Sequence, residues 1–221
     1  MDFAPKRFFI PGTGIQISET VTTTWGIMLV LVIFSCLATR KLKDIPIHEV
    51  PDRRRGALEL LVESLVNLVE STMGKERRGF TPYMGTLVLY LLIANLIGLI
   101  GIRPPTADLN TTLCLSTLTV TAVQYYGLKE KGLIRYLKGY LEPFVLFLPM
   151  NIMGEISPLI SMGFRLFGNI IGGLIIMTMI YNVVPLLLPI LPHMYFDIFS
   201  GVIQTFIFVM LTMTFISIAM D

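Results

Sequence analysis

Residues 158–173 read PLISMGFRLFGNIIGG, and Arg165 is the only charged side chain between Glu155 and Asp197. Apolar residues fill most of that interval. The nearest charge lies ten residues back, about 15 Å along a helix, which is farther than an arginine stem can extend. The guanidinium is therefore predicted to lie at membrane depth, where it costs roughly 2.5–3.5 kcal/mol on insertion scales. Such a group persists where it faces water, a partner charge or an ion pathway.

Small and polar residues surround this arginine. Ser161 and Asn169 lie four residues to either side of Arg165, so a helix presents all three on one face. Small residues at a helix surface let a second helix approach closely. The glycines predicted to serve this packing are Gly163, Gly168, Gly172 and Gly173. The alternative is an arginine bonded within its own helix bundle, with no part in transport.

The apolar segment that contains Arg165 is too long for one perpendicular crossing. Residues 142–184 would extend about 65 Å as a helix, against a hydrocarbon core of about 30 Å. The helix must therefore bend, break or tilt. Prolines that could bend or break it are Pro143, Pro149 and Pro158. A second proline group then marks a turn before the C-terminal helix, at Pro185, Pro189 and Pro192.

Composition places the chain in a membrane. Its 221 residues are 54% hydrophobic and 14% charged, with a mean hydropathy of +0.74. Soluble domains carry nearer a quarter charged residues. A net charge of +2 is too small to indicate a nucleic-acid partner. Cys36 and Cys114 both fall in apolar runs, so neither a disulfide nor a metal site is predicted.

The predicted fold is an all-α polytopic membrane protein in one domain, residues 1–221. It has about five transmembrane helices, the last two forming a long tilted hairpin, and one amphipathic surface helix. The tail before the first span has no continuous apolar core, so no cleaved signal peptide is predicted. The predicted segments are an outer tail at 1–20, spans at 21–39, 82–102 and 111–128, an amphipathic cytoplasmic helix at 51–74, the long helix at 142–184 and the C-terminal helix at 194–220.

The amphipathic helix alternates leucines with acidic residues. The leucines recur at helical spacing, at Leu58, Leu61, Leu65 and Leu68. The opposite face carries Glu59, Glu63 and Glu70. Two roles fit this pattern: packing on the bilayer surface, and docking of a partner protein.

Loop charges predict the orientation. Residues 40–78 hold nine of the seventeen Lys and Arg, residues 129–138 hold four, and residues 103–110 hold one. The positive-inside rule places the two basic loops in the cytoplasm. The N-terminus is then expected outside and the C-terminus in the cytoplasm.

Enzyme motifs are missing from the sequence. His48-Glu49 is followed by Asp52 where an HExxH zinc site needs histidine, and Gly74-Lys75 is followed by glutamate rather than Ser or Thr. No GxSxG occurs. A secondary ion-coupled transporter with an intramembrane arginine is the main alternative, although it predicts internal repeats that the sequence does not show. A stand-alone channel is the other.

Three segments resemble one family. Residues 165–169 read RLFGN and follow Pro158 and Glu155; residues 105–112 read PTADLNTT; residues 204–208 read QTFIF, followed by Leu-Thr. Together they resemble subunit a of F-type ATP synthases, in the expected order and from about residue 81 to the end of the chain.

This resemblance implies a non-catalytic stator subunit that conducts ions. In the family, the arginine faces the ion-carrying carboxylates of the rotating c-ring and separates two aqueous half-channels. The implied cargo is a proton or a sodium ion, with no cofactor and no metal site. The implied partners are the c-ring, the peripheral-stalk subunit b and the lipid bilayer, in a hetero-oligomeric complex. The implied location is a bacterial plasma membrane.

The resemblance also implies roles for single residues. Arg165, Asn169 and Gln204 match positions near the ring contact. Glu155 matches an acidic position near the inner half-channel, and Asp197 a polar position of the outer one. Some members carry a carboxylate nine residues after the arginine, where this chain has a leucine, Leu174. The outer path is therefore assigned to Asp197, with His193 and Tyr195 as weaker candidates. Ser161, on the same helix face as the arginine, is a further secondary candidate.

Several of these residues could line an ion path or could have a purely structural role. Asp197, Gly201, Gln204 and Phe208 form one stripe if their segment is α-helical, and a polar stripe can line a water-filled cavity. Gln204 could instead bond to a neighbouring helix, and Glu155 could pair with a loop lysine. His193 lies between prolines and an aromatic residue, which is typical of an interfacial position. Asp108 is expected to cap a turn.

Overall fold

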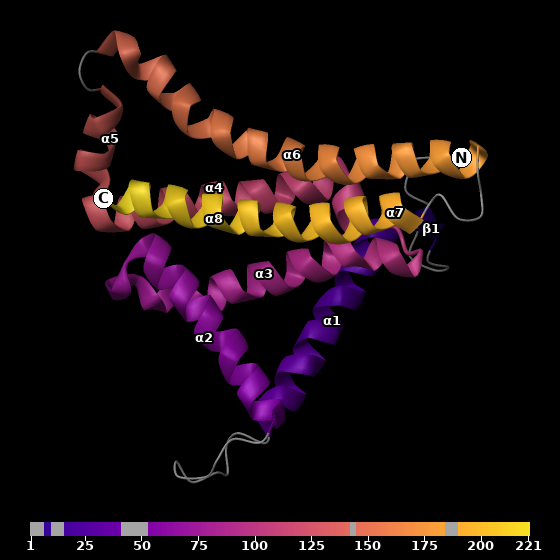
Figure 1. Ribbon diagram of the computed structural model, residues 1–221. Helices are drawn as coiled ribbons and strands as arrows, with labels where there is room; N and C mark the ends of the chain where they lie inside the picture. The colour runs from indigo at the N-terminus through magenta and orange to yellow at the C-terminus, as the bar shows by residue number, and fades with distance from the viewer. Residues whose placement is uncertain (1–6, 10–15, 41–52, 142–144, 184–189) are drawn as a thin grey trace. The chain divides into compact units, whose positions relative to one another are not determined.

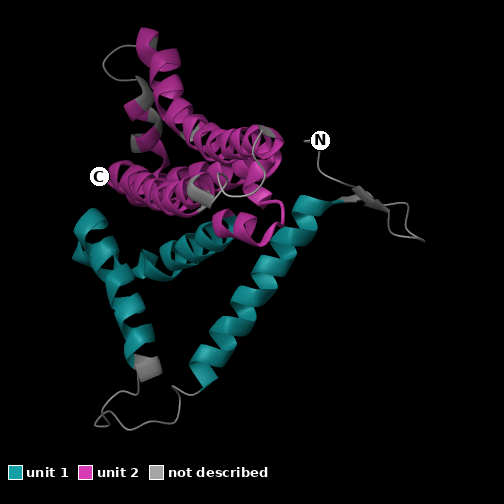
Figure 2. Ribbon diagram, turned by 45° about the vertical axis from the view of Figure 1, so that its right-hand side comes forward, with its two compact units in different colours: residues 1–94 teal, residues 95–221 magenta. Residues whose placement is uncertain are grey.

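The computed structural model describes residues 7–9, 16–40, 53–141, 145–183 and 190–221. Helices make up nearly all of these residues, which confirms the predicted all-α class. The chain divides into two compact units, residues 1–94 and 95–221 (Figure 2). Each unit is described by itself.

The first unit begins with a small antiparallel hairpin. Strands β1 (Arg7–Phe9) and β2 (Gln16–Ser18) pair with Phe8 opposite Ile17. Helix α1 (Glu19–Arg40) follows directly, and the Ser18 hydroxyl lies 2.7 Å from that of Thr20 at its start. A serine before the first helical turn satisfies polar groups that the helix leaves unpaired.

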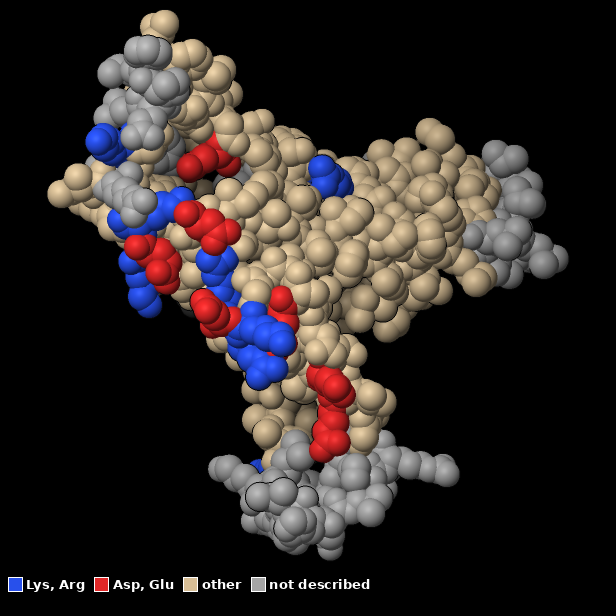
Figure 3. Space-filling model, turned by 60° about the vertical axis from the view of Figure 1, so that its left-hand side comes forward, with Lys and Arg blue, Asp and Glu red and all other residues tan. Residues whose placement is uncertain are grey.

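Helices α2 (Arg53–Met73) and α3 (Thr81–Leu96) approach each other at one point, where a Cβ on Gly85 would lie 3.2 Å from Cδ1 of Leu65. Gly74, at φ 92°, ends α2 and leads into the 3₁₀ helix η1 (Lys75–Phe80). Glu70 forms an ion pair with Arg78 across this turn. Charges of both signs are interspersed along α2 and η1, whereas uncharged residues cover most of the face drawn (Figure 3).

The second unit is a helical bundle. Helices α4, α6 and α8 run side by side, and Figure 1 shows α5 turning away from the end of α4. The elements are η2 (Ile97–Ile100), η3 (Pro105–Ala107), α4 (Leu109–Lys131), α5 (Leu133–Leu141), η4 (Val145–Phe147), α6 (Leu148–Val183), α7 (Ile190–His193), the π-helical segment η5 (Met194–Phe199) and α8 (Ser200–Met220).

Helix α4 has defined ends. Oδ1 of Asp108 accepts a hydrogen bond of 3.0 Å from the backbone N–H of Asn110, which confirms the predicted capping role. Gly132 follows the last turn with φ 75°, a conformation that glycine adopts without steric cost. The chain can therefore change direction there and begin α5.

Helix α6 has 36 residues, or about 54 Å, which is longer than a bilayer core is thick. Its first part runs obliquely before the helix continues beside α8 (Figure 1). Pro158 lies inside the helix, and an internal proline removes one backbone hydrogen bond and bends the axis. The prolines expected at 143, 185 and 189 lie outside the described residues.

Within the described residues, four helical segments are long and apolar enough to cross a membrane: Glu19–Arg40, Lys75–Ile100, Leu148–Asn182 and Met194–Met220. About five spans were predicted. The difference is α4, which is 23 residues long but rich in threonine. Its polar residues Thr112, Ser116 and Thr119 are buried, so the polarity serves contacts within the bundle.

Candidate functional site

Helix α6 has one face inside the bundle and one outside. The buried face carries Met162, Gly163, Leu166, Ile170, Gly173 and Met177. The exposed face carries Ser161, Phe164, Arg165, Gly168, Ile175, Ile176 and Met179. Both sets recur at helical spacing, so the exposed face is a continuous apolar stripe. Arg165 is the only charge on it.

Arg165 lies at the middle of α6, about 25 Å from either helix end. Its side chain is exposed. Within the residues that the structure describes, the guanidinium makes no ion pair and no hydrogen bond. Nothing described in the chain therefore compensates this charge.

Two contacts define how α6 and α8 are aligned. The Ser200 hydroxyl donates a hydrogen bond of 2.7 Å to Oδ1 of Asn169, and a Cβ on Gly173 would lie 3.3 Å from Cβ of Phe196. This antiparallel register places Arg165 at the level of Gln204. Gln204 is only 6% exposed, so it faces the bundle interior while Arg165 faces outward.

The stripe expected on the last helix is present in part. Gly201, Gln204 and Phe208 are all buried on one face of α8. The Asp197 side chain lies outside the described residues, and the backbone around it is π-helical. A π-helix turns less per residue than an α-helix, so the spacing that joined Asp197 to this stripe does not apply unchanged.

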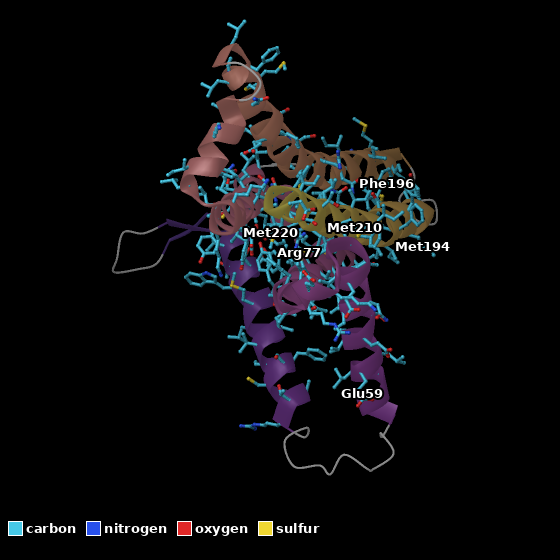
Figure 4. The ribbon with its side chains drawn as sticks, turned by 90° about the vertical axis from the view of Figure 1, so that its left-hand side faces the viewer. Glu59, Arg77, Met194, Phe196, Met210 and Met220 are labelled. Carbon is cyan, nitrogen blue, oxygen red and sulfur yellow. The ribbon has the colours of Figure 1, made fainter. Side chains whose placement is uncertain are left out.

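Figure 4 shows Met194 and Phe196 at one end of the η5–α8 segment and Met220 at the other. His193 and Tyr195, the two weaker candidates for the outer path, lie near the first end. The His193 Nε2 and the Tyr181 hydroxyl are 2.7 Å apart. Tyr195 is exposed and stacks on Phe199 with ring centroids 5.7 Å apart.

The four glycines divide into two pairs. A Cβ on Gly163 would lie 3.0 Å from Oγ of Ser116, and Gly173 packs against Phe196, so these two serve packing inside the unit. Gly168 and Gly172 have no atom within 4 Å of such a Cβ. They leave open space beside Arg165 and Asn169.

Glu155 lies about 15 Å along α6 from Arg165, so the two do not meet. Its Oε2 accepts a hydrogen bond of 2.9 Å from Nε2 of Gln124 and lies 3.3 Å from the Tyr136 hydroxyl. Sequence reasoning missed both partners. Gln124 could have been noticed as the one amide inside the span predicted at 111–128.

A second buried cluster was also missed. Asn95 is 1% exposed, and its Nδ2 donates to the carbonyl of Gly201 at 3.2 Å and to Oγ1 of Thr205 at 3.1 Å. Its Oδ1 accepts from Oγ1 of Thr106 at 3.1 Å. These bonds hold α8 to the start of the second unit. Within the described residues, no group of three His, Cys, Asp or Glu side chains is placed to hold a metal ion.

The sequence model of the ATP synthase A chain family matches residues 21–217. This chain belongs to that family. It is therefore a multi-pass membrane protein and a subunit of a multi-subunit complex.

Curated relatives agree along most of the chain. ATP synthase subunit a of Moorella thermoacetica is 38% identical over 92% of this chain and 91% of its own length. A subunit a of a Bradyrhizobium strain is 36% identical over 93% of this chain and 90% of its own length. The subunit a of Propionigenium modestum, named sodium ion specific, is 35% identical over 92% of this chain and 74% of its own length.

Proposed function

We propose that this chain is the stator ion channel of a rotary F-type ATP synthase. It carries ions to and from the carboxylates of the c-ring through two offset half-channels that Arg165 separates. The chain itself breaks no covalent bond and needs no cofactor. The observation that carries the proposal is Arg165, which lies at the centre of an exposed apolar helix face and has no ion pair or hydrogen bond among the described residues.

Electrostatics explains why such an arginine would drive the reaction. A ring carboxylate in lipid must be neutral, because an isolated carboxylate is costly there. Beside a fixed positive charge the ionised form is favoured, so the carboxylate releases its ion. A new ion must load from the other half-channel before the carboxylate returns to lipid. The same positive charge repels a cation that would otherwise pass straight through.

The surroundings of Arg165 suit a close partner helix. Gly168 and Gly172 leave open space on the exposed side of α6. The Asn169 Oδ1 is engaged by Ser200, which directs its two N–H donors elsewhere. A partner carboxylate at this face would meet one guanidinium and one amide donor.

The approaches to Arg165 lie at opposite ends of the bundle. Glu155 belongs to the inner approach, with the C-terminus in the cytoplasm. Asp197 belongs to the outer one, with His193 and Tyr195 near it and the N-terminus outside. Peripheral-stalk subunit b would dock on α2, whose exposed residues include Leu60, Leu61 and Val62. The location proposed is a bacterial plasma membrane.

The coupling ion is proposed to be the proton, with sodium as the alternative because one relative is named sodium ion specific. ATP-driven pumping in sodium-free buffer separates the two. Pumping that continues without sodium identifies the proton as the ion. A requirement for millimolar sodium identifies sodium as the coupling ion.

Cysteine cross-linking tests whether this face meets the ring. Cys36 and Cys114 are exposed and would first be replaced by serine. Phe164→Cys, at a position 51% exposed beside Arg165, should cross-link to a cysteine placed at mid-membrane on a ring subunit. Leu166→Cys, at a fully buried position, is the matched control and should not. A complex that assembles but shows no cross-link from Phe164→Cys contradicts the proposal.

A further inference from the structure

We propose that Tyr136, acting with Gln124, is a positioning residue that holds the Glu155 carboxyl group on the inner ion path. This inference rests on the function proposed above, and it assigns a role in ion conduction to α5. The three side chains come from three helices, α5, α4 and α6. Tyr136 is 8% exposed, and the other two are half-buried.

The contacts form a closed triangle. The Tyr136 hydroxyl donates to Oε1 of Gln124 at 2.8 Å and lies 3.3 Å from Oε2 of Glu155. Nε2 of Gln124 donates to the same Glu155 oxygen at 2.9 Å. Hydrogen bonds at both Oε1 and Nε2 therefore fix the orientation of the Gln124 amide. One oxygen of Glu155 faces two potential donors.

Two glycines make this arrangement possible. Gly132, at φ 75°, redirects the chain after α4, and its carbonyl accepts a hydrogen bond of 3.0 Å from the backbone N–H of Tyr136. Gly127 leaves room for the ring, since a Cβ there would lie 3.0 Å from Cε2 of Tyr136 and 3.3 Å from the carbonyl oxygen of Ala219. The tyrosine ring thus occupies space that a larger residue at position 127 would fill.

The hydroxyl can serve both protonation states of Glu155. It has one hydrogen and two lone pairs, so it donates to only one acceptor at a time. It can donate to the carboxylate when Glu155 is ionised. It can donate to Gln124 and accept from the carboxyl group when Glu155 is protonated. The position of Glu155 is then maintained while its proton comes and goes.

Tyr136→Phe is the first variant to measure. The ring still fills the space beside Gly127, so the complex should assemble normally. Losing a hydrogen bond to a charged group should lower passive proton conduction by about tenfold or more, measured in vesicles carrying the membrane sector. Tyr125→Phe is the matched control, because Tyr125 is 59% exposed and its ring meets that of Tyr126 in a T-shaped pair.

A second background separates positioning from general stability. Glu155→Gln complexes should conduct less than wild type, and adding Tyr136→Phe to them should cause no further loss. A structural role would lower conduction by the same factor in both backgrounds. Gly127→Ala, which displaces the ring, should lower conduction in the same direction and also weaken assembly.

Several results would overturn the inference without touching the proposed function. One is equal conduction in assembled Tyr136→Phe and Tyr125→Phe complexes. Another is normal conduction in Glu155→Gln, which would remove Glu155 from the path. The inference would also be wrong if Tyr136→Phe lowered conduction by the same factor in wild-type and Glu155→Gln complexes. The proposed function fails on a different result, coupled pumping that survives Arg165→Ala.

Discussion

Ser200 donates its hydroxyl hydrogen to Oδ1 of Asn169 over 2.7 Å, which joins α8 to α6 one turn beyond Arg165. The bond crosses between the two helices of the C-terminal hairpin and sets the direction of the Asn169 amide. Asn169 is half-buried, so its amide stands at the border between the bundle and the open face of α6.

Ser200→Ala should reduce coupled ion pumping by about two- to fivefold, the effect of one ordinary hydrogen bond. The amide of Asn169 would then be free to rotate away from a ring carboxylate. ATP-driven pumping in vesicles, normalised to the amount of assembled complex, measures the effect. Ser200→Thr keeps a hydroxyl and should pump nearly normally. Unchanged pumping in Ser200→Ala would mean that the orientation of Asn169 is unimportant.

Alanine substitutions should separate the two classes of glycine. Gly163→Ala places a Cβ 3.0 Å from Oγ of Ser116 and 3.3 Å from the carbonyl oxygen of Thr112, and backbone cannot move aside easily. We expect a loss of about 1–3 kcal/mol in stability, seen as a lower thermal midpoint of the purified complex.

Gly168→Ala is the control for that effect, because its Cβ meets nothing within 4 Å. It should leave the thermal midpoint unchanged or raise it, since alanine favours a helix over glycine. Gly168→Leu should keep that midpoint yet reduce coupled pumping, by filling the space proposed for the ring. Equal midpoints for Gly163→Ala and Gly168→Ala would contradict this division.

Asn95→Ala should destabilise the second unit. It removes the donor to Gly201 and Thr205 and the acceptor of Thr106, all in a buried site. Membrane hydrogen bonds average about 0.6 kcal/mol each, so a total of about 1–3 kcal/mol is expected. Thermal unfolding of the purified complex measures it, and Asn110→Ala, at an exposed position, should change little. A midpoint equal to wild type would show that the cluster contributes no stability.

Patterns in the amino-acid sequence predicted the long helix around Arg165. The apolar run around Arg165 indicated a helix longer than a bilayer, and α6 runs from Leu148 to Val183. Asp108 was expected to cap a turn, and it caps the first turn of α4. These features depend on residues close together in the sequence, where helical periodicity and capping chemistry suffice.

Contacts between helices could not be predicted in the same way. The bond from Ser200 to Asn169 and the triangle around Glu155 depend on how helices are aligned and rotated against one another. Hydrophobic periodicity indicates which face of a helix is buried, but not which helix packs against that face. The same reason explains the glycines, since spacing alone did not tell that Gly163 faces α4 while Gly168 faces outward. The π-helical turn at Met194–Phe199 changes the rotation that regular spacing assumes.

The central claim is that Arg165 separates the two half-channels and makes the ring carboxylates release their ions. ATP-driven ion pumping by vesicles carrying Arg165→Ala tests it most directly, beside wild type and Arg165→Lys, which keeps a charge but loses the planar fork. We predict that Arg165→Ala abolishes coupled pumping in a complex that still assembles and still hydrolyses ATP when uncoupled. Normal coupled pumping in an assembled Arg165→Ala complex would contradict the account.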